Sequence, residues 1–290
     1  MDPNNQVMRF FFKIPSLPLA YTSMVVYLLF SIYLTVRVYR TKSARFLYIL
    51  GFTALMEAIG YAVRIACADF TDFKRFITST LFLLLAPNAL ALVNYKAVGE
   101  IIRLSNVKSE KFYLRPKFVT WFFFASDIFV FLMQGAGSGM QSDYKNLKKG
   151  QAITLIGLAL QLVFLACFAA ITVYVQNSPK YNYYVAGCEN PKKKLVFSLY
   201  VTISLIYVRS IYRVVEYAYG YTGPVVRAEW ALYVFDTLAI AICFLLYCIF
   251  FIGNYLPKHD ADPTQIYDSE SSLSVNQTEK SRQEIQLDQA

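Results

Sequence analysis

Residues 152–175 read AITLIGLALQLVFLACFAAITVYV, a stretch in which no side chain carries a charge. A helix of about 20 apolar residues crosses the roughly 30 Å hydrocarbon core of a bilayer, so this stretch is long enough to span one. Outward from it, similar apolar runs recur along the chain. Together with the quoted one, their approximate ranges are 17–36, 46–67, 76–98, 118–139, 152–175, 195–216 and 229–252. The sequence therefore predicts an all-α integral membrane protein, a bundle of seven transmembrane helices.

Composition and loop charge support this prediction and suggest an orientation. The 290 residues are 57% hydrophobic and only 16% charged, which is too apolar for a soluble domain of this length. Lysines and arginines outside the spans divide 8 to 17 between the two sides. Because cytoplasmic loops retain positive charge, we expect the N-terminus outside and the C-terminus in the cytosol. The net charge of +9 thus reflects topology, and no nucleic-acid partner is expected.

Three segments follow from the pattern: a short extracellular N-terminus (1–16), the transmembrane domain (17–256) and an acidic cytosolic tail (257–290). The tail is rich in Asp, Glu, Ser and Gln, so we expect it to be disordered, with serines available to a kinase or a cytosolic partner. The multi-pass protein is expected in the plasma membrane, with a vacuolar or other endomembrane as the alternative.

Metal and nucleotide chemistry find little support. The five cysteines show no CxxC spacing, and His259 is the one histidine of the chain. Zinc hydrolases of the membrane need several histidines, so we expect no metal, no cofactor and no enzyme. No P-loop motif is present, which argues against ATP hydrolysis by this chain.

Ionisable residues inside the spans are the main functional signal, because each costs about 2.5–3.5 kcal/mol at bilayer depth on insertion scales. They are Glu57, Arg64, Asp127, Arg209, Arg213, Glu216, Glu229 and Asp236. Several polar residues recur seven apart, which places them on one helical face two turns away from each other. Arg209 and Arg213 are like charges one turn apart, so acids from the second, fourth or seventh span should lie against them.

The predicted topology places these residues, together with Gln134 and Gln161, in the middle and outer half of the bundle. We therefore expect a polar cavity lined by spans two, four, five, six and seven, with an apolar first span at the periphery. It could bind a substrate or carry a proton, for which Glu57, Asp127 and Asp236 are the candidates. The alternative is that buried ion pairs only fix helix register.

Three breakers of regular helix structure accompany the charges. Pro87 lies in the interior of the third span, where it removes a backbone hydrogen bond and predicts a kink. Asn88 and Asn94 are expected to satisfy the freed backbone groups. Gly135 and Gly137, near the end of the fourth span, permit close helix packing or an unwound end. Ordinary plasticity of membrane helices is the alternative explanation.

Several motifs in order along the chain resemble the RTA1-like family of fungal lipid-translocating exporters. They are EAIGYAVR (57–64), LLAPNALALVNYKAVGEII (84–102), SDIFVFLMQGAGSG (126–139), GQAITLIGLALQ (150–161) and SIYRVVEYAYGYTGPVVRAEWALYVFD (210–236). The resemblance covers nearly the whole transmembrane domain. It departs at Glu100, where the family usually has a basic residue.

The resemblance implies a seven-helix protein that moves amphipathic molecules, among them sphingoid bases, sterol-like toxins and porphyrins, and that contributes to stress or drug resistance. It also implies roles for the charged residues already singled out, with the exception of Arg209, and for Pro87, Gly135 and Gly137. The expected partners are membrane lipids and an amphipathic substrate. The alternative is a seven-helix receptor or sensor, or a regulator of lipid asymmetry that transports nothing.

Overall fold

The computed structural model describes residues 16–69, 73–105, 115–141, 146–178, 180–181, 191–219 and 229–256, and the regular elements in these ranges are all helical. Within them lie seven spans long and apolar enough to cross a membrane, which confirms the predicted fold. The orientation of the bundle stays a prediction from the loop charges. The predicted tail and all but the last residue of the predicted N-terminal segment lie outside the described residues.

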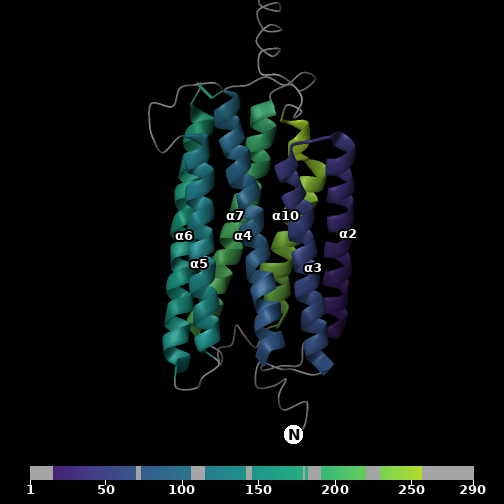
Figure 1. Ribbon diagram of the computed structural model, residues 1–290, viewed down its shortest axis with the longest axis vertical. Coiled ribbons are helices and arrows are strands. Elements are labelled where there is room, and N and C mark those ends of the chain that lie inside the picture. The colour runs from purple at the N-terminus through teal and green to yellow at the C-terminus, as the bar shows by residue number, and fades with distance from the viewer. Residues whose placement is uncertain are drawn as a thin grey trace, which may run out of the picture.

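The spans follow one another as an up-and-down bundle (Figure 1). Six are single helices: α2 (Leu17–Thr41), α3 (Tyr48–Asp69), α4 (Phe73–Leu104), α5 (Pro116–Met140), α6 (Leu147–Asn177) and α7 (Pro191–Tyr219). The seventh combines α9 (Glu229–Leu232), a π-helical turn η4 (Tyr233–Leu238) and α10 (Ala239–Ile249). Short 3₁₀ turns, η1 (Arg45–Leu47) and η5 (Ile252–Asn254), precede α3 and follow α10.

The third span occupies the centre of the bundle. Helix α4 packs against α3 and α5 and also touches α6 and α7, and it is the most buried of the spans. Figure 1 shows it between the α5–α6 pair on one side and α3 with α2 on the other. The expectation of a polar cavity did not assign this central span to its walls, and the cavity itself stays a prediction.

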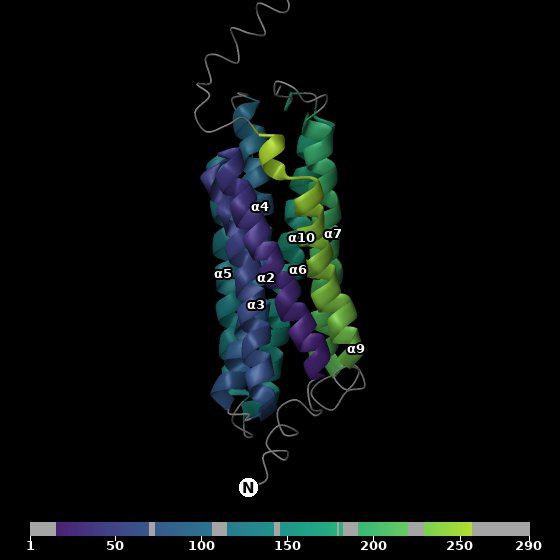
Figure 2. The ribbon, with the colours of Figure 1, turned by 90° about the vertical axis from the view of Figure 1, so that its right-hand side faces the viewer.

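The first span lies at the edge of the bundle, as predicted, where it packs on α3 and α10 (Figure 2). Large apolar side chains cover the outer surface of the bundle, as a bilayer requires. Among the most exposed are Leu29, Ile32, Trp121, Phe129, Leu132, Val163 and Ile249. The polar residues of the spans are turned inward instead, and they form the candidate site.

Candidate functional site

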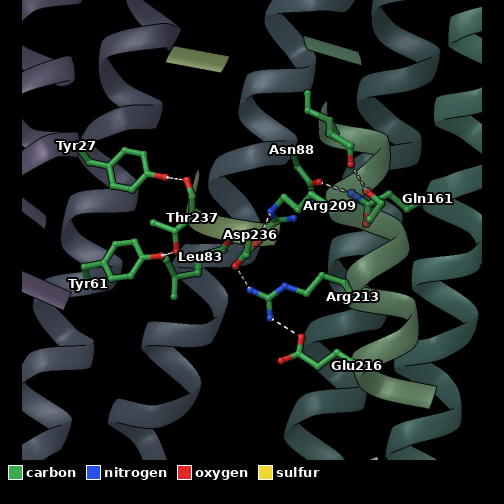
Figure 3. Close-up of polar contacts among 12 residues, drawn as sticks. Tyr27, Tyr61, Leu83, Asn88, Gln161, Arg209, Arg213, Glu216, Asp236 and Thr237 are labelled. Carbon is green, nitrogen blue, oxygen red and sulfur yellow. Dashed lines mark hydrogen bonds and ion pairs between the residues drawn. The ribbon is translucent and has the colours of Figure 1, made fainter. Parts of the chain in front are cut away.

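An ion-pair cluster joins α7 to the seventh span. The Asp236 carboxylate in η4 pairs through one oxygen with Arg209 Nε and through the other with Arg213 Nη2 (Figure 3). Arg213 Nη1 also bonds Glu216 Oε2 at 3.1 Å. Arg209, Arg213 and Asp236 are all buried. The expectation that an acid of span two, four or seven lies against the two arginines is confirmed.

The local structure of the two elements explains this geometry. Arg209 and Arg213 lie one turn apart on α7, so their guanidinium groups point to the same side. Asp236 belongs to a π-helical turn, in which the backbone is wider than in an α-helix. Such turns are rare and occur frequently at functional sites. The apolar pattern of this span gave no sign of the π-turn.

Pro87 creates the second anchor of Arg209. Proline has no N–H, so the carbonyl of Leu83, four residues earlier, has no donor from the regular helical ladder. Arg209 Nη2 donates to this carbonyl oxygen at 2.8 Å. Helix α4 is continuous through Pro87, and Arg209 links the turn before this proline to the π-turn of the seventh span.

The expectation that Asn88 and Asn94 serve the freed backbone group is wrong. Asn88 Oδ1 accepts a hydrogen bond from Gln161 Nε2 on α6 at 2.6 Å. Asn94 Oδ1 accepts one from the Tyr247 hydroxyl on α10 at 2.5 Å. Both side chains therefore join helices to each other, because they point across helix interfaces and not along α4.

Glu57 lies buried on α3 beside the ion-pair cluster. The charges of Arg209, Arg213 and Asp236 act on its carboxylate, but it forms no ion pair within the described ranges. Glu57 is 3% exposed. Glu216 and Asp236 are paired with arginines, whereas Glu57 has no direct cationic partner within the described ranges.

Two tyrosines lie near Glu57 and bind the residue that follows Asp236, Thr237. Tyr27 and Tyr61 stack with ring centroids 5.8 Å apart, and the charge of Glu57 acts on both. The Tyr27 hydroxyl donates to the backbone carbonyl of Thr237 at 2.6 Å, and the Tyr61 hydroxyl shares a hydrogen bond of 2.5 Å with the Thr237 side chain. The first span, expected to be purely apolar, thus contributes Tyr27 to the site.

Two further predicted residues lie at the margin of this region. Arg64 is half-buried on α3, and its charge acts on Glu216. Glu229 begins α9, and its side chain lies outside what the structure describes. Arg64, like Glu57, thus belongs with the ion-pair cluster electrostatically.

A chain of buried amides crosses the other half of the bundle. Gln134 Nε2 on α5 donates to Gln161 Oε1 on α6 at 3.0 Å, and Gln161 Nε2 donates on to Asn88 on α4. Figure 3 shows the hydrogen bond between Gln161 and Asn88. At the two ends of the chain, Gln134 Oε1 and Asn88 Nδ2 have no partner among the described residues.

Asp127 is separated from the arginines. It is buried on α5, where its carboxylate hydrogen-bonds with the hydroxyl of Tyr95 on α4. It forms no ion pair in the described part of the chain. The expected convergence of all in-membrane charges therefore needs correction, because α5 faces α4 and α6 while the arginines lie on α7.

Of the two predicted packing glycines, Gly137 has the tighter environment. A Cβ atom at Gly137 would lie 2.8 Å from both Gly150 O and Thr154 N on α6, so the two helices are in backbone contact. A Cβ atom at Gly135 would meet its nearest neighbour, Leu81 Cδ2, at 3.6 Å, an ordinary contact. Helix α5 continues to Met140, so close packing and not an unwound end is observed.

Sequence reasoning missed the Leu83 carbonyl and three tyrosines, Tyr27, Tyr61 and Tyr95. Two signals were available. A proline always frees the carbonyl four residues before it, which identifies Leu83 from Pro87. Tyr61 lies one turn after Glu57, on the same face of its helix.

This fold and site define a class: a seven-span membrane protein with a buried cluster of ion pairs between its helices. The family model described as RTA1 like protein matches residues 48–259, and the chain belongs to this family. It is therefore an integral multi-pass membrane protein. No solved structure matches the chain.

Curated relatives come from fungi. Protoporphyrin uptake protein 1 of Saccharomyces cerevisiae is 29% identical, over 69% of this chain and 67% of that protein. Protein RTA1 of the same species is 30% identical, over 69% of this chain and 63% of its own length. Sphingoid long-chain base transporter RSB1 of S. cerevisiae (strain Lalvin EC1118) is 23% identical over 83% of this chain and 72% of that protein. The names within the family thus point to transport, including that of lipids.

Proposed function

We propose that this chain translocates an amphipathic, lipid-like amine, such as a sphingoid long-chain base, across the bilayer. Two kinds of observation support the proposal. Relatives include the sphingoid base transporter and the probable lipid transporter atnI of Emericella nidulans. The bundle also holds charged groups at bilayer depth, where a polar head group would need them while its apolar tail remained in lipid.

The pairing of the charges favours an amine over an anionic head group. Arg209 is bound to Asp236 and to the Leu83 carbonyl, and Arg213 is bound to Asp236 and Glu216. A phosphate or carboxylate would have to displace a carboxylate that is already in place. A cationic amine needs only Glu57, whose carboxyl group has no direct cationic partner within the described ranges and releases its proton as the amine binds. This free acid is the observation that carries the proposal.

The tyrosines beside Glu57 fit the same ligand. The rings of Tyr27 and Tyr61 are electron-rich surfaces, and a cation over such a ring gains about 0.5–2 kcal/mol. We expect a long-chain ammonium group to gain one ionic contribution from Glu57 and an aromatic one from this stack of tyrosines.

Purified protein in liposomes tests this function. We expect Glu57→Gln to reduce the flux of a labelled sphingoid base at least 10-fold, because the amide keeps the shape and removes the charge. Glu100→Gln is the matched control, since Glu100 pairs with exposed Arg103 at the end of α4. Wild-type flux in a folded Glu57→Gln variant would overturn the proposal.

In cells, we propose export at the plasma membrane and resistance to toxic long-chain amines, with the acidic tail as a site for a kinase or cytosolic partner. Deletion of the gene should sensitise cells to an added sphingoid base. Rescue by the wild-type chain, but not by Glu57→Gln, is expected. Equal rescue by both would contradict the link between Glu57 and resistance.

A further inference from the structure

The interface of α4, α5 and α6 contains two polar layers separated by two helical turns. Each helix contributes one residue to each layer, seven positions apart, so both residues lie on the same face. The first layer is the amide chain of Asn88, Gln134 and Gln161; the second contains Tyr95, Asp127 and Phe168. We call this interface the α4–α5–α6 seam.

Aromatic rings pack around Tyr95, the partner of the acid in the second layer. The Tyr95 ring lies 4.5 Å from the Phe168 ring and 5.4 Å from the Phe123 ring, measured between centroids. Asp127 is 6% exposed, and its Oδ2 atom has no partner in the described part of the chain. A carboxyl group is therefore held in a largely apolar setting, with the Tyr95 hydroxyl as its hydrogen-bond partner.

A comparison of charges sets Asp127 apart from the other acids. Glu57, Glu216 and Asp236 all lie within electrostatic reach of arginines, and Glu216 and Asp236 also form ion pairs with them. Asp127 has no such counterpart: Tyr95 from α4 is the titratable group that acts on it, and α6 faces it with Phe168 and uncharged neighbours. Among the in-span acids whose side chains the structure describes, Asp127 is thus the one outside the electrostatic reach of the three arginines.

An ionised carboxylate in such a place costs several kcal/mol, and the neutral acid costs far less. We infer that Asp127 is a proton-binding site, occupied at neutral pH in this conformation, and that its proton is the coupling ion of the transport cycle. The carboxylate takes its proton from water on one side of the membrane and returns it to water on the other. The coupling part of the inference rests on the proposed transport function; the proton-binding part does not.

Infrared spectroscopy of the resting protein tests proton binding without any substrate. We expect the carboxylic acid C=O absorption at neutral pH to lose one component in Asp127→Asn, and the same component to shift in Tyr95→Phe, which removes the hydrogen bond to the acid. Glu100→Gln should leave the band unchanged. Identical spectra for wild type and a folded Asp127→Asn variant would overturn the inference, and transport could still be correct.

Coupling is tested in liposomes with an N-trimethylated long-chain base, which carries no exchangeable proton on its nitrogen. A gradient of this cation should drive opposing proton movement, seen with a trapped pH dye. We expect Asp127→Asn to abolish the proton signal while downhill flux of the cation persists. An unchanged proton signal, or loss of the cation flux as well, would overturn the coupling role.

Discussion

Helix α4 lies between two polar regions, the ion-pair cluster and the α4–α5–α6 seam, whose buried polar groups have different kinds of partner. On one side, the ion-pair cluster binds each of its two α7 arginines in two ways, to Asp236 and to either Leu83 or Glu216. On the other side, the seam uses uncharged amides and one acid, and atoms at both ends of its amide chain have no partner among the described residues. Both regions thus keep buried polar atoms without a hydrogen-bond partner among the described residues, Arg213 Nε in the cluster among them, but each charged side chain of the cluster is ion-paired, and Asp127 in the seam is not.

The energies of the two kinds of contact differ severalfold. Breaking a buried ion pair by removing one partner costs about 3–5 kcal/mol. Interhelical hydrogen bonds in membrane proteins average only about 0.6 kcal/mol. The cluster should therefore hold α7 and the seventh span together as a unit, while α4, α5 and α6 can exchange partners at the seam.

The largest effect is expected from Asp236→Ala, which leaves two buried guanidinium groups without their carboxylate. We expect the free energy of unfolding to fall by about 3–5 kcal/mol. Thermal unfolding in detergent measures this loss. If the variant unfolds like the wild type, the cluster does not hold the helices together and the contrast with the seam disappears.

An intermediate effect is expected where α5 meets α6. Gly137→Ala pushes a methyl group against Gly150 and Thr154, and overpacking of this kind costs about 1–3 kcal/mol. Gly139→Ala is the matched control, because a Cβ atom there meets nothing within 4 Å. Equal unfolding temperatures for the two variants would show that the α5–α6 interface accommodates the added methyl group without loss of stability.

A smaller effect is expected within the amide chain itself. A double-mutant cycle with Asn88→Ala and Gln161→Ala should give a coupling energy of about 0.6 kcal/mol, and below about 1.7 kcal/mol. Unfolding of the two single variants and the double variant supplies the value. A coupling energy as large as the loss in Asp236→Ala would show that the amide chain stabilises the bundle as strongly as the ion-pair cluster does.

The smallest effect sets the baseline for both regions. Arg103 Nε and Glu100 Oε2 pair at 2.7 Å near the end of α4, in an exposed position. Glu100→Gln should change the free energy of unfolding by less than about 0.5 kcal/mol, as is usual for exposed helical pairs. A greater loss in the same unfolding assay would make Glu100→Gln unsuitable as the control for Glu57→Gln.

The sequence predicted the fold well because bilayer crossing depends on length and apolarity, both of which can be read directly. The observed helices extend beyond the predicted runs, as at Arg103 in α4 and Lys148 in α6, because hydropathy detects only the part inside the hydrocarbon. The contact of Asp236 with two arginines was also predictable, since like charges one turn apart require an acid.

Other features of the site depend on how helices are rotated, which local patterns do not encode. Asp127 faces Tyr95 and not Arg209 because of the orientation of α5 relative to α4. Asn88 points to α6, so it could not serve the carbonyl that Pro87 frees. The π-turn around Asp236 arises in an apolar stretch with no glycine or proline to announce it.

Pro87 creates a position inside α4 where a side chain, Arg209, replaces the regular backbone donor of the helix. The Leu83 carbonyl has no N–H donor in its own helix, so bending at this point breaks the bond from Arg209 and no backbone hydrogen bond at Leu83. A hydrogen bond to a charged group is worth about 1.5–3 kcal/mol, which is the local polar cost of a bend. Because α4 is the most buried span, a bend at Pro87 also has to be accompanied by rearrangement of the helices packed against it.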